Sequence, residues 1–238
     1  IPQWAMWYVL ELEQYLNHRN PEACREFFRD TVLGLVNYFE KFENPDGLLE
    51  KLEGWNFIEW SAANKWGHDV NYPTNFLYSE MLECADKIFD LPHLSKKAAK
   101  IREKTIELSF DGSFFTDNAI RNESGALVNT GNRSEACQYY AIRFGHIDIC
   151  APKYATLCDA VYNIFGPGRT DALPDIEKAN ALMGIYLRME ILLGEKKYER
   201  LLDEIRGYFG YMAEQTGTLW EYTEPKGSLD HGFASFAG

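Results

Sequence analysis

The segment 217–238, GTLWEYTEPKGSLDHGFASFAG, combines glycines and aromatic rings with side chains that can perform acid–base chemistry. Glu221 stands between Trp220 and Tyr222, and His231 follows in the same segment. Glycosidic bonds are cleaved by two carboxyl groups, one that protonates the leaving oxygen and one that attacks the sugar or activates water. Burial between aromatic rings raises the pKa of a carboxyl group. Glu221 is therefore a candidate catalytic residue, and a tail packed down by its aromatic side chains is the structural alternative.

A second segment, GWNFIEWSAANKWGHD, gathers three tryptophans around a carboxylate: Trp55, Trp60 and Trp66 accompany Glu59. Indole rings stack on the C–H face of a pyranose, and carboxylates accept hydrogen bonds from sugar hydroxyl groups. The pattern predicts a sugar-binding loop. A packed loop that uses tryptophan as filler is the alternative.

Two further segments carry charged residues near expected helix starts. In NRSEACQYY, either Asn132 or Ser134 suits an N-cap, and Glu135 would then complement the helix dipole. In FGPGRTDALPD, Arg169 and Asp175 are the notable residues, and Asp175 is predicted to be a first-turn acid or a cap of a helix.

The composition excludes several classes of function. The net charge is −12 and Lys and Arg form no cluster, which argues against a nucleic-acid partner and favours a neutral or cationic small ligand. No apolar run approaches the roughly 18 residues that span a membrane. The five cysteines form no C-x-x-C pair and the histidines are scattered, so neither a metal site nor a cofactor is expected.

Apolar residues recur at helical spacing along nearly the whole chain, which predicts an all-α protein. Short links alternate with long ones, so the helices should form four antiparallel pairs whose long loops share one end, the candidate active face. An α-solenoid interaction module is the alternative, although no repeat at the pair period is found. The expected helices are about 4–17, 21–42, 73–90, 93–110, 133–145, 151–165, 175–193 and 196–215.

The run GTLWEYTEPKGSLDHGFAS resembles the end of the catalytic domain of bacterial α-L-rhamnosidases, glycoside hydrolase family 78, where a T-x-W-E motif precedes a Ser-x-Asn-His-type segment. WNFIEW with YPTNFLYSEMLECADKI, and SEACQYYAIRFG, are similar to further parts of that domain in the same order. The resemblance implies an (α/α)6 six-hairpin toroid. It also implies an inverting mechanism that releases terminal α-L-rhamnose from glycans or glycosides.

The resemblance further implies roles for individual residues. Glu221 would be the catalytic base that activates water. The substrate-binding residues would be Glu59, Trp60, Trp55 and His231, with Trp66 and Trp220 completing the predicted set. Asp230 stands where the family more often has Asn, and Glu59 where it has Asp, so the sugar itself is left open.

The family's general acid lies in a motif upstream of the matched region, and nothing like that motif occurs before residue 50. Residues 1–238 are thus expected to be one domain truncated at its N-terminus, with about four of six hairpins and without the acid. A bacterial cytoplasm or periplasm is the expected compartment. Two alternatives stay open: another six-hairpin glycosidase, such as an unsaturated uronide hydrolase, or a non-catalytic helical carbohydrate-binding module.

Overall fold

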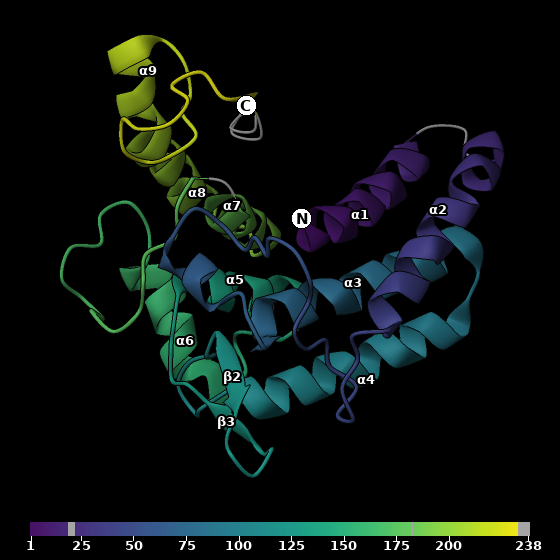
Figure 1. Ribbon diagram of the computed structural model, residues 1–238. Coiled ribbons are helices and arrows are strands. Elements are labelled where there is room, and N and C mark those ends of the chain that lie inside the picture. Colours follow the sequence, from purple (N-terminus) through teal and green to yellow (C-terminus); the bar gives the residue numbers. More distant parts are fainter. Residues whose placement is uncertain (19–21, 182, 233–238) are drawn as a thin grey trace. The chain divides into compact units, whose positions relative to one another are not determined.

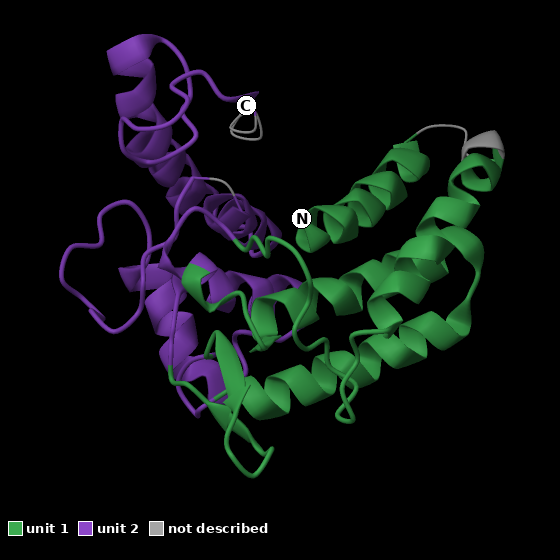
Figure 2. Ribbon diagram, viewed as in Figure 1, with its two compact units in different colours: residues 1–58, 65–110, 116–131 green, residues 59–64, 111–115, 132–238 purple. Residues whose placement is uncertain are grey.

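A computed structural model describes residues 1–18, 22–181 and 183–232, and helices dominate it (Figure 1). The all-α class predicted from the sequence is confirmed. The chain divides into two compact units, residues 1–58, 65–110 and 116–131 in the first and residues 59–64, 111–115 and 132–238 in the second (Figure 2). The single domain and the number of hairpins expected from the sequence stay predictions.

The first unit is built on four long helices, among which α3 packs against both α4 and α1. Asn71 caps α3 by accepting a hydrogen bond from the Thr74 amide, and Pro73 suits the first turn because its missing N–H is not needed there. The helices are α1 (Pro2–His18), α2 (Glu22–Glu40), α3 (Tyr72–Phe89) and α4 (Pro92–Ser109).

A small antiparallel sheet also belongs to the first unit, where the sequence suggested irregular chain. Its strands are β1 (Val70–Asn71), β2 (Asn118–Arg121) and β3 (Leu127–Asn129), in the order β1-β2-β3. The Asn122 side chain accepts hydrogen bonds from the Ser124 and Ala126 amides and so closes the turn between β2 and β3. Local side-chain bonding of this kind fixes a hairpin without an apolar alternation.

The second unit holds shorter helices interrupted by π turns, at 160–164 and 206–210 among the described residues. The short 3-10 helix Ala62–Trp66 crosses the boundary between the units, and another covers Pro152–Tyr154. The helices are α5 (Glu135–Phe144), α6 (Ala155–Asp159), α7 (Met183–Gly194), α8 (Tyr198–Ile205) and α9 (Tyr211–Thr216).

One sequence-based boundary was wrong in this unit. The helices expected over 151–165 and 196–215 are present as continuous helical chain over 152–164 and 198–216, although each contains a π turn. The helix expected from residue 175 begins at Met183, so Asp175 lies in a turn rather than in a first helical turn. Glu177 is held in extended chain instead, because its backbone exchanges hydrogen bonds with Arg133 and Glu135.

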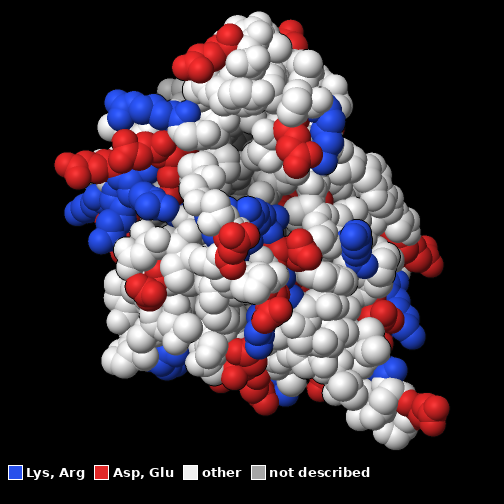
Figure 3. Space-filling view, turned by 90° about the vertical axis from the view of Figure 1, so that its left-hand side faces the viewer, with Lys and Arg blue, Asp and Glu red and all other residues white. Residues whose placement is uncertain are grey.

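Figure 3 shows that acidic side chains are interspersed with basic ones over one face of the molecule, with uncharged areas between them. In the part of the chain that the structure describes, every helix is too short or too polar to traverse a lipid bilayer.

Candidate functional site

A cavity of about 880 Å³ opens in the second unit. This volume lies within the roughly 300–1,000 Å³ of ordinary small-molecule sites. Its wall is formed by Trp60, by Glu135 at the start of α5, by residues of the 166–180 segment and by Thr223, Glu224 and Lys226. The cavity wall thus combines the loop that contains Trp60, the 166–180 segment and the 217–238 segment with the start of α5.

The π turn at 206–210 shapes this wall. Gly207 and Tyr208 lie within the turn and line the cavity, together with Tyr211 at the start of α9. A methyl group on Gly207 would lie 2.7 Å from Cγ of Pro167, so a larger residue would collide with the 166–180 segment. Sequence periodicity predicted one continuous helix over 196–215 and did not locate this turn, which is a single-turn insertion within that helix.

Glu221 lies in a loop that is closed by its own hydrogen bonds. The Glu221 amide donates to the Ser228 carbonyl oxygen (2.9 Å), and the Ser228 amide donates back to Oε2 of Glu221 (3.0 Å). The His231 amide donates to the Leu219 carbonyl oxygen (2.9 Å). Gly227 has a φ of +68°, and a Cβ there would lie 2.7 Å from Oε2 of Glu221. This loop therefore holds a half-buried carboxylate in one position.

Trp220 anchors the same loop to the helices beneath it. Its side chain is 2 % exposed and packs in an apolar cluster with Ile185, Met189, Phe209 and Met212. Nε1 of the indole donates to Oγ1 of Thr216 (2.8 Å). Burial of an indole contributes more stabilisation than most other side chains can, so Trp220 keeps its neighbour Glu221 in place.

Trp60 is the predicted sugar contact that lines the cavity. Its ring lies 5.4 Å, centroid to centroid, from the ring of Tyr222, at an interplanar angle of 33°. The two aromatic residues follow directly after the two carboxylates proposed from the sequence, Glu59 and Glu221. The aromatic pair therefore joins the two segments that carry these acids.

Glu59 is fully buried, and Oε2 accepts hydrogen bonds from the Gly184 amide (3.0 Å) and the Asn180 amide (3.3 Å). Burial raises the pKa of Glu59 to about 7, although hydrogen bonds from Ser61, Asn180 and Gly184 oppose the rise. A Cβ on Gly184 would lie 2.2 Å from Oε2 of Glu59, so only glycine leaves room for the carboxyl group.

The raised pKa predicts how the stability conferred by Glu59 depends on pH. Folded protein binds the Glu59 proton more tightly than the unfolded chain does, so stability is lost as the pH rises from about 4.5 towards 7. Glu59→Gln has no charge to bury. We expect its free energy of unfolding, relative to the parent protein, to rise by up to about 3 kcal/mol between pH 4.5 and pH 8.

Urea unfolding of both proteins at several pH values measures this difference. Glu214→Gln, the same chemical change on an exposed carboxylate of α9, is the matched control and should follow the parent protein at every pH. Identical pH profiles for Glu59→Gln and the parent would contradict the buried titration.

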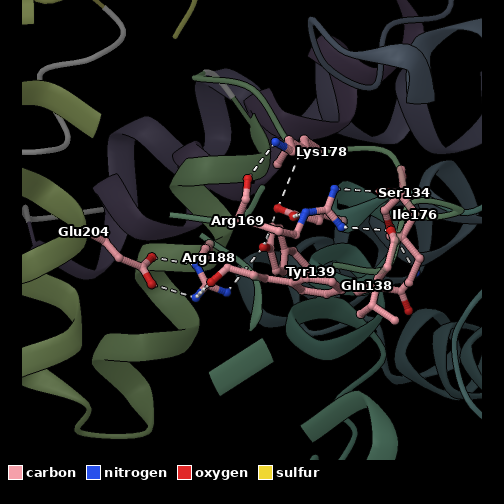
Figure 4. Close-up of polar contacts among 12 residues, drawn as sticks. Ser134, Gln138, Tyr139, Arg169, Ile176, Lys178, Arg188 and Glu204 are labelled. Carbon is pink, nitrogen blue, oxygen red and sulfur yellow. Dashed lines mark hydrogen bonds and ion pairs between the residues drawn. The ribbon is translucent and has the colours of Figure 1, made fainter. Parts of the chain in front are cut away.

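Glu135 and Arg169 form a buried ion pair within the cavity wall, with Nε of Arg169 3.0 Å from Oε1 of Glu135. Figure 4 shows the Arg169 side chain of this pair. The Tyr139 hydroxyl donates to Oε2 of Glu135 (2.9 Å), and Arg169 donates to the Ile176 carbonyl oxygen (2.7 Å). Burial raises the pKa of Glu135, and the Arg169 charge opposes that rise. The pair ties the 166–180 segment to α5.

Ser134 caps α5 because its hydroxyl oxygen accepts a hydrogen bond from the Cys137 amide, which confirms one of the two predicted N-caps.

The remaining predicted contacts are distributed over both units. Trp55 is half-exposed in the first unit, where its ring meets that of Phe57 at 5.6 Å. Trp66 also belongs to the first unit, and its carbonyl oxygen accepts a hydrogen bond from Asn71. His231 is partly exposed in the second unit. Residues 233–238 of the C-terminal segment lie outside the described residues.

Comparison with solved structures places the fold. The whole chain superposes on a GH78 family rhamnosidase of Bacillus sp. GL1 with a TM-score of 0.79 and 18 % sequence identity, covering 25 % of that chain. The chain has the helical fold of GH78 rhamnosidases. A rhamnosidase from Klebsiella oxytoca with rhamnose bound shares this rhamnosidase fold, with a TM-score of 0.71, 15 % identity and 46 % of that chain covered. No family model and no curated protein sequence matches the chain.

The family resemblance inferred from the sequence motifs is thus confirmed at the level of the fold. The chain spans less than half the length of either rhamnosidase structure, so it corresponds to part of those proteins. Within the rhamnosidase fold, the second unit carries the Glu221 loop, Trp60 and the cavity.

Proposed function

We propose that this chain provides the water-activating side of an inverting glycoside hydrolase that releases terminal α-L-rhamnose. The observation that carries the proposal is the Glu221 loop. It bears the T-x-W-E motif, its following residues line the cavity, and it belongs to a chain with the rhamnosidase fold over its whole length.

In this mechanism, Glu221 takes a proton from water as the water oxygen attacks the anomeric carbon. The glycosidic C–O bond breaks, and its electrons move to the leaving oxygen, which is protonated by a second carboxyl group. Inverting enzymes place the two carboxyl groups about 6.5–9.5 Å apart to leave room for that water.

Trp60 supports this role because an indole on a cavity wall offers a flat apolar face to a sugar ring. The polar side chains around the same cavity can bind hydroxyl groups. We propose Trp60 and His231 as sugar contacts. Contacts of the sugar with Glu59, Trp55, Trp66 and Trp220, expected from the sequence, stay predictions.

The proposal is tested with a panel of aryl glycosides and the protein expressed from its complete gene. We expect hydrolysis of the aryl α-L-rhamnoside, at a kcat/KM at least about 100-fold above that of any other glycoside in the panel. A sugar whose hydroxyl groups do not match the site leaves polar groups of the site unpaired, and this lowers its kcat/KM. Preferred cleavage of an unsaturated uronide would indicate a different six-hairpin glycosidase. Sugar binding without hydrolysis of any substrate would indicate a binding module.

A further inference from the structure

Asn180 lies between the two segments that carry the acids and the paired aromatic rings. Its Nδ2 donates a hydrogen bond to the Trp60 carbonyl oxygen (2.8 Å), and its Oδ1 accepts one from the Thr223 amide (2.9 Å). One side-chain amide thus binds the backbone of Trp60 on one side and the residue after Tyr222 on the other. In the sequence, Trp60 precedes Asn180 by 120 residues and Thr223 follows it by 43 residues.

Asn180 is itself held in place from three directions. Its backbone amide faces Oε2 of Glu59 (3.3 Å), and its carbonyl oxygen accepts from the Ile185 amide (3.2 Å) in the first turn of α7. Oδ1 also accepts from the Ala181 amide (2.7 Å). Because the side-chain oxygen has two lone pairs and both are engaged, its acceptor capacity is used within the protein.

These bonds fix the ring contact between Trp60 and Tyr222. Asn180 binds the backbone of Trp60 and of the residue after Tyr222, and so restrains the separation of the Trp60 and Tyr222 rings, which is 5.4 Å between centroids. The same bond to Thr223 restrains the loop two residues beyond Glu221. Loss of the amide would therefore remove the bonds that Asn180 makes to the Trp60 carbonyl oxygen and the Thr223 N–H, and so loosen both segments at once.

Resting on the proposed function, we propose that Asn180 is a positioning residue: its side-chain amide holds the water-activating Glu221 loop in register with the sugar-contacting Trp60 segment. Asn180 does not take part in proton transfer. It acts through the two backbone groups that it binds, so its two hydrogen bonds have separable consequences.

Two substitutions separate these consequences in the protein expressed from its complete gene. Asn180→Ala removes both bonds, and we expect kcat for an aryl α-L-rhamnoside to fall by about 100-fold, the cost of displacing a catalytic group by roughly 1 Å. Asn180→Asp keeps an acceptor for Thr223 but places a carboxylate oxygen against the Trp60 carbonyl. It should raise KM by about 10-fold and lower kcat by no more than about 3-fold.

A second readout does not depend on activity. In Asn180→Ala, hydrogen exchange of the peptide covering 219–228 should accelerate by about 10-fold or more, because the Thr223 N–H loses its acceptor, whereas Asn180→Asp should exchange like the parent. Asn163→Ala is the matched control. Asn163 is exposed and bonds to Asp159, and its replacement should change neither kinetics nor exchange at 219–228.

Unchanged exchange at 219–228 in Asn180→Ala, or equal kinetic losses in KM and kcat for both variants, would overturn the positioning role. If Asn180→Ala does not fold, accelerated hydrogen exchange at 219–228 in Asn180→Asp would also overturn the positioning role. Parent protein that hydrolyses no rhamnoside would contradict the proposed function instead, and the exchange result would then decide the role of Asn180 by itself.

Discussion

Replacement of Glu221 by Gln is expected to lower kcat for an aryl α-L-rhamnoside by about 10³-fold, while the Kd for L-rhamnose changes by less than about 3-fold. Gln has nearly the same shape as Glu, and its carbonyl oxygen can still accept the Ser228 N–H that now bonds to Oε2. The loop should therefore keep its geometry. A neutral amide, however, cannot take a proton from the attacking water, so the chemical step fails while sugar binding survives.

Steady-state kinetics and calorimetric titration of L-rhamnose into both proteins measure these two quantities. Glu214→Gln, which neutralises an exposed carboxylate on α9, is expected to retain parental activity. Glu221→Gln protein that keeps more than about a tenth of the parental kcat would refute the role of Glu221 as the base.

Replacement of Glu204 by Gln is expected to destabilise the protein by about 3–5 kcal/mol. Arg188 is fully buried, and its Nε and Nη2 bind the two carboxylate oxygens of Glu204 at 2.6 and 2.7 Å (Figure 4). Nη2 also donates to the Phe165 carbonyl oxygen (3.0 Å). With the carboxylate neutralised, the buried guanidinium charge would lose the carboxylate that binds it directly, and removing one partner of a buried ion pair is strongly destabilising.

Urea unfolding compares this variant with Asp203→Asn, which neutralises the preceding residue. Asp203 pairs with Arg206 at the surface, where both side chains are more than two-thirds exposed, so its loss should cost about 1 kcal/mol or less. The double replacement Arg188→Met with Glu204→Leu should recover much of the stability lost in Glu204→Gln, because it removes both buried charges. Equal losses for Glu204→Gln and Asp203→Asn would contradict the buried pair.

Features that depend on neighbouring residues could be predicted from the sequence. Ser134 was one of two candidates for the N-cap of α5, and its hydroxyl binds an amide only three residues along the chain. The T-x-W-E motif likewise identified the Glu221 loop, and helical spacing identified the all-α class. In each case the interaction that decides the structure lies within a few residues.

Features that depend on distant partners could not be predicted. Residues 175–181 have helical spacing, yet Glu177 bonds to Arg133 and Glu135, and these contacts hold it in extended chain. The same reason hid Asn180, whose partners are backbone groups of Trp60 and Thr223 rather than side chains of any recognisable pattern. Glu135 was expected to complement the dipole of α5, and its ion pair with Arg169 became visible only in three dimensions.

The stereochemistry of hydrolysis tests most directly whether Glu221 activates water. Proton NMR of the aryl α-L-rhamnoside reaction, recorded within the first minutes, identifies the anomer of rhamnose that forms first. Attack by water on the face opposite the leaving group predicts β-L-rhamnose as the first product, which then mutarotates. Initial formation of α-L-rhamnose would show a retaining reaction and would contradict the proposed mechanism.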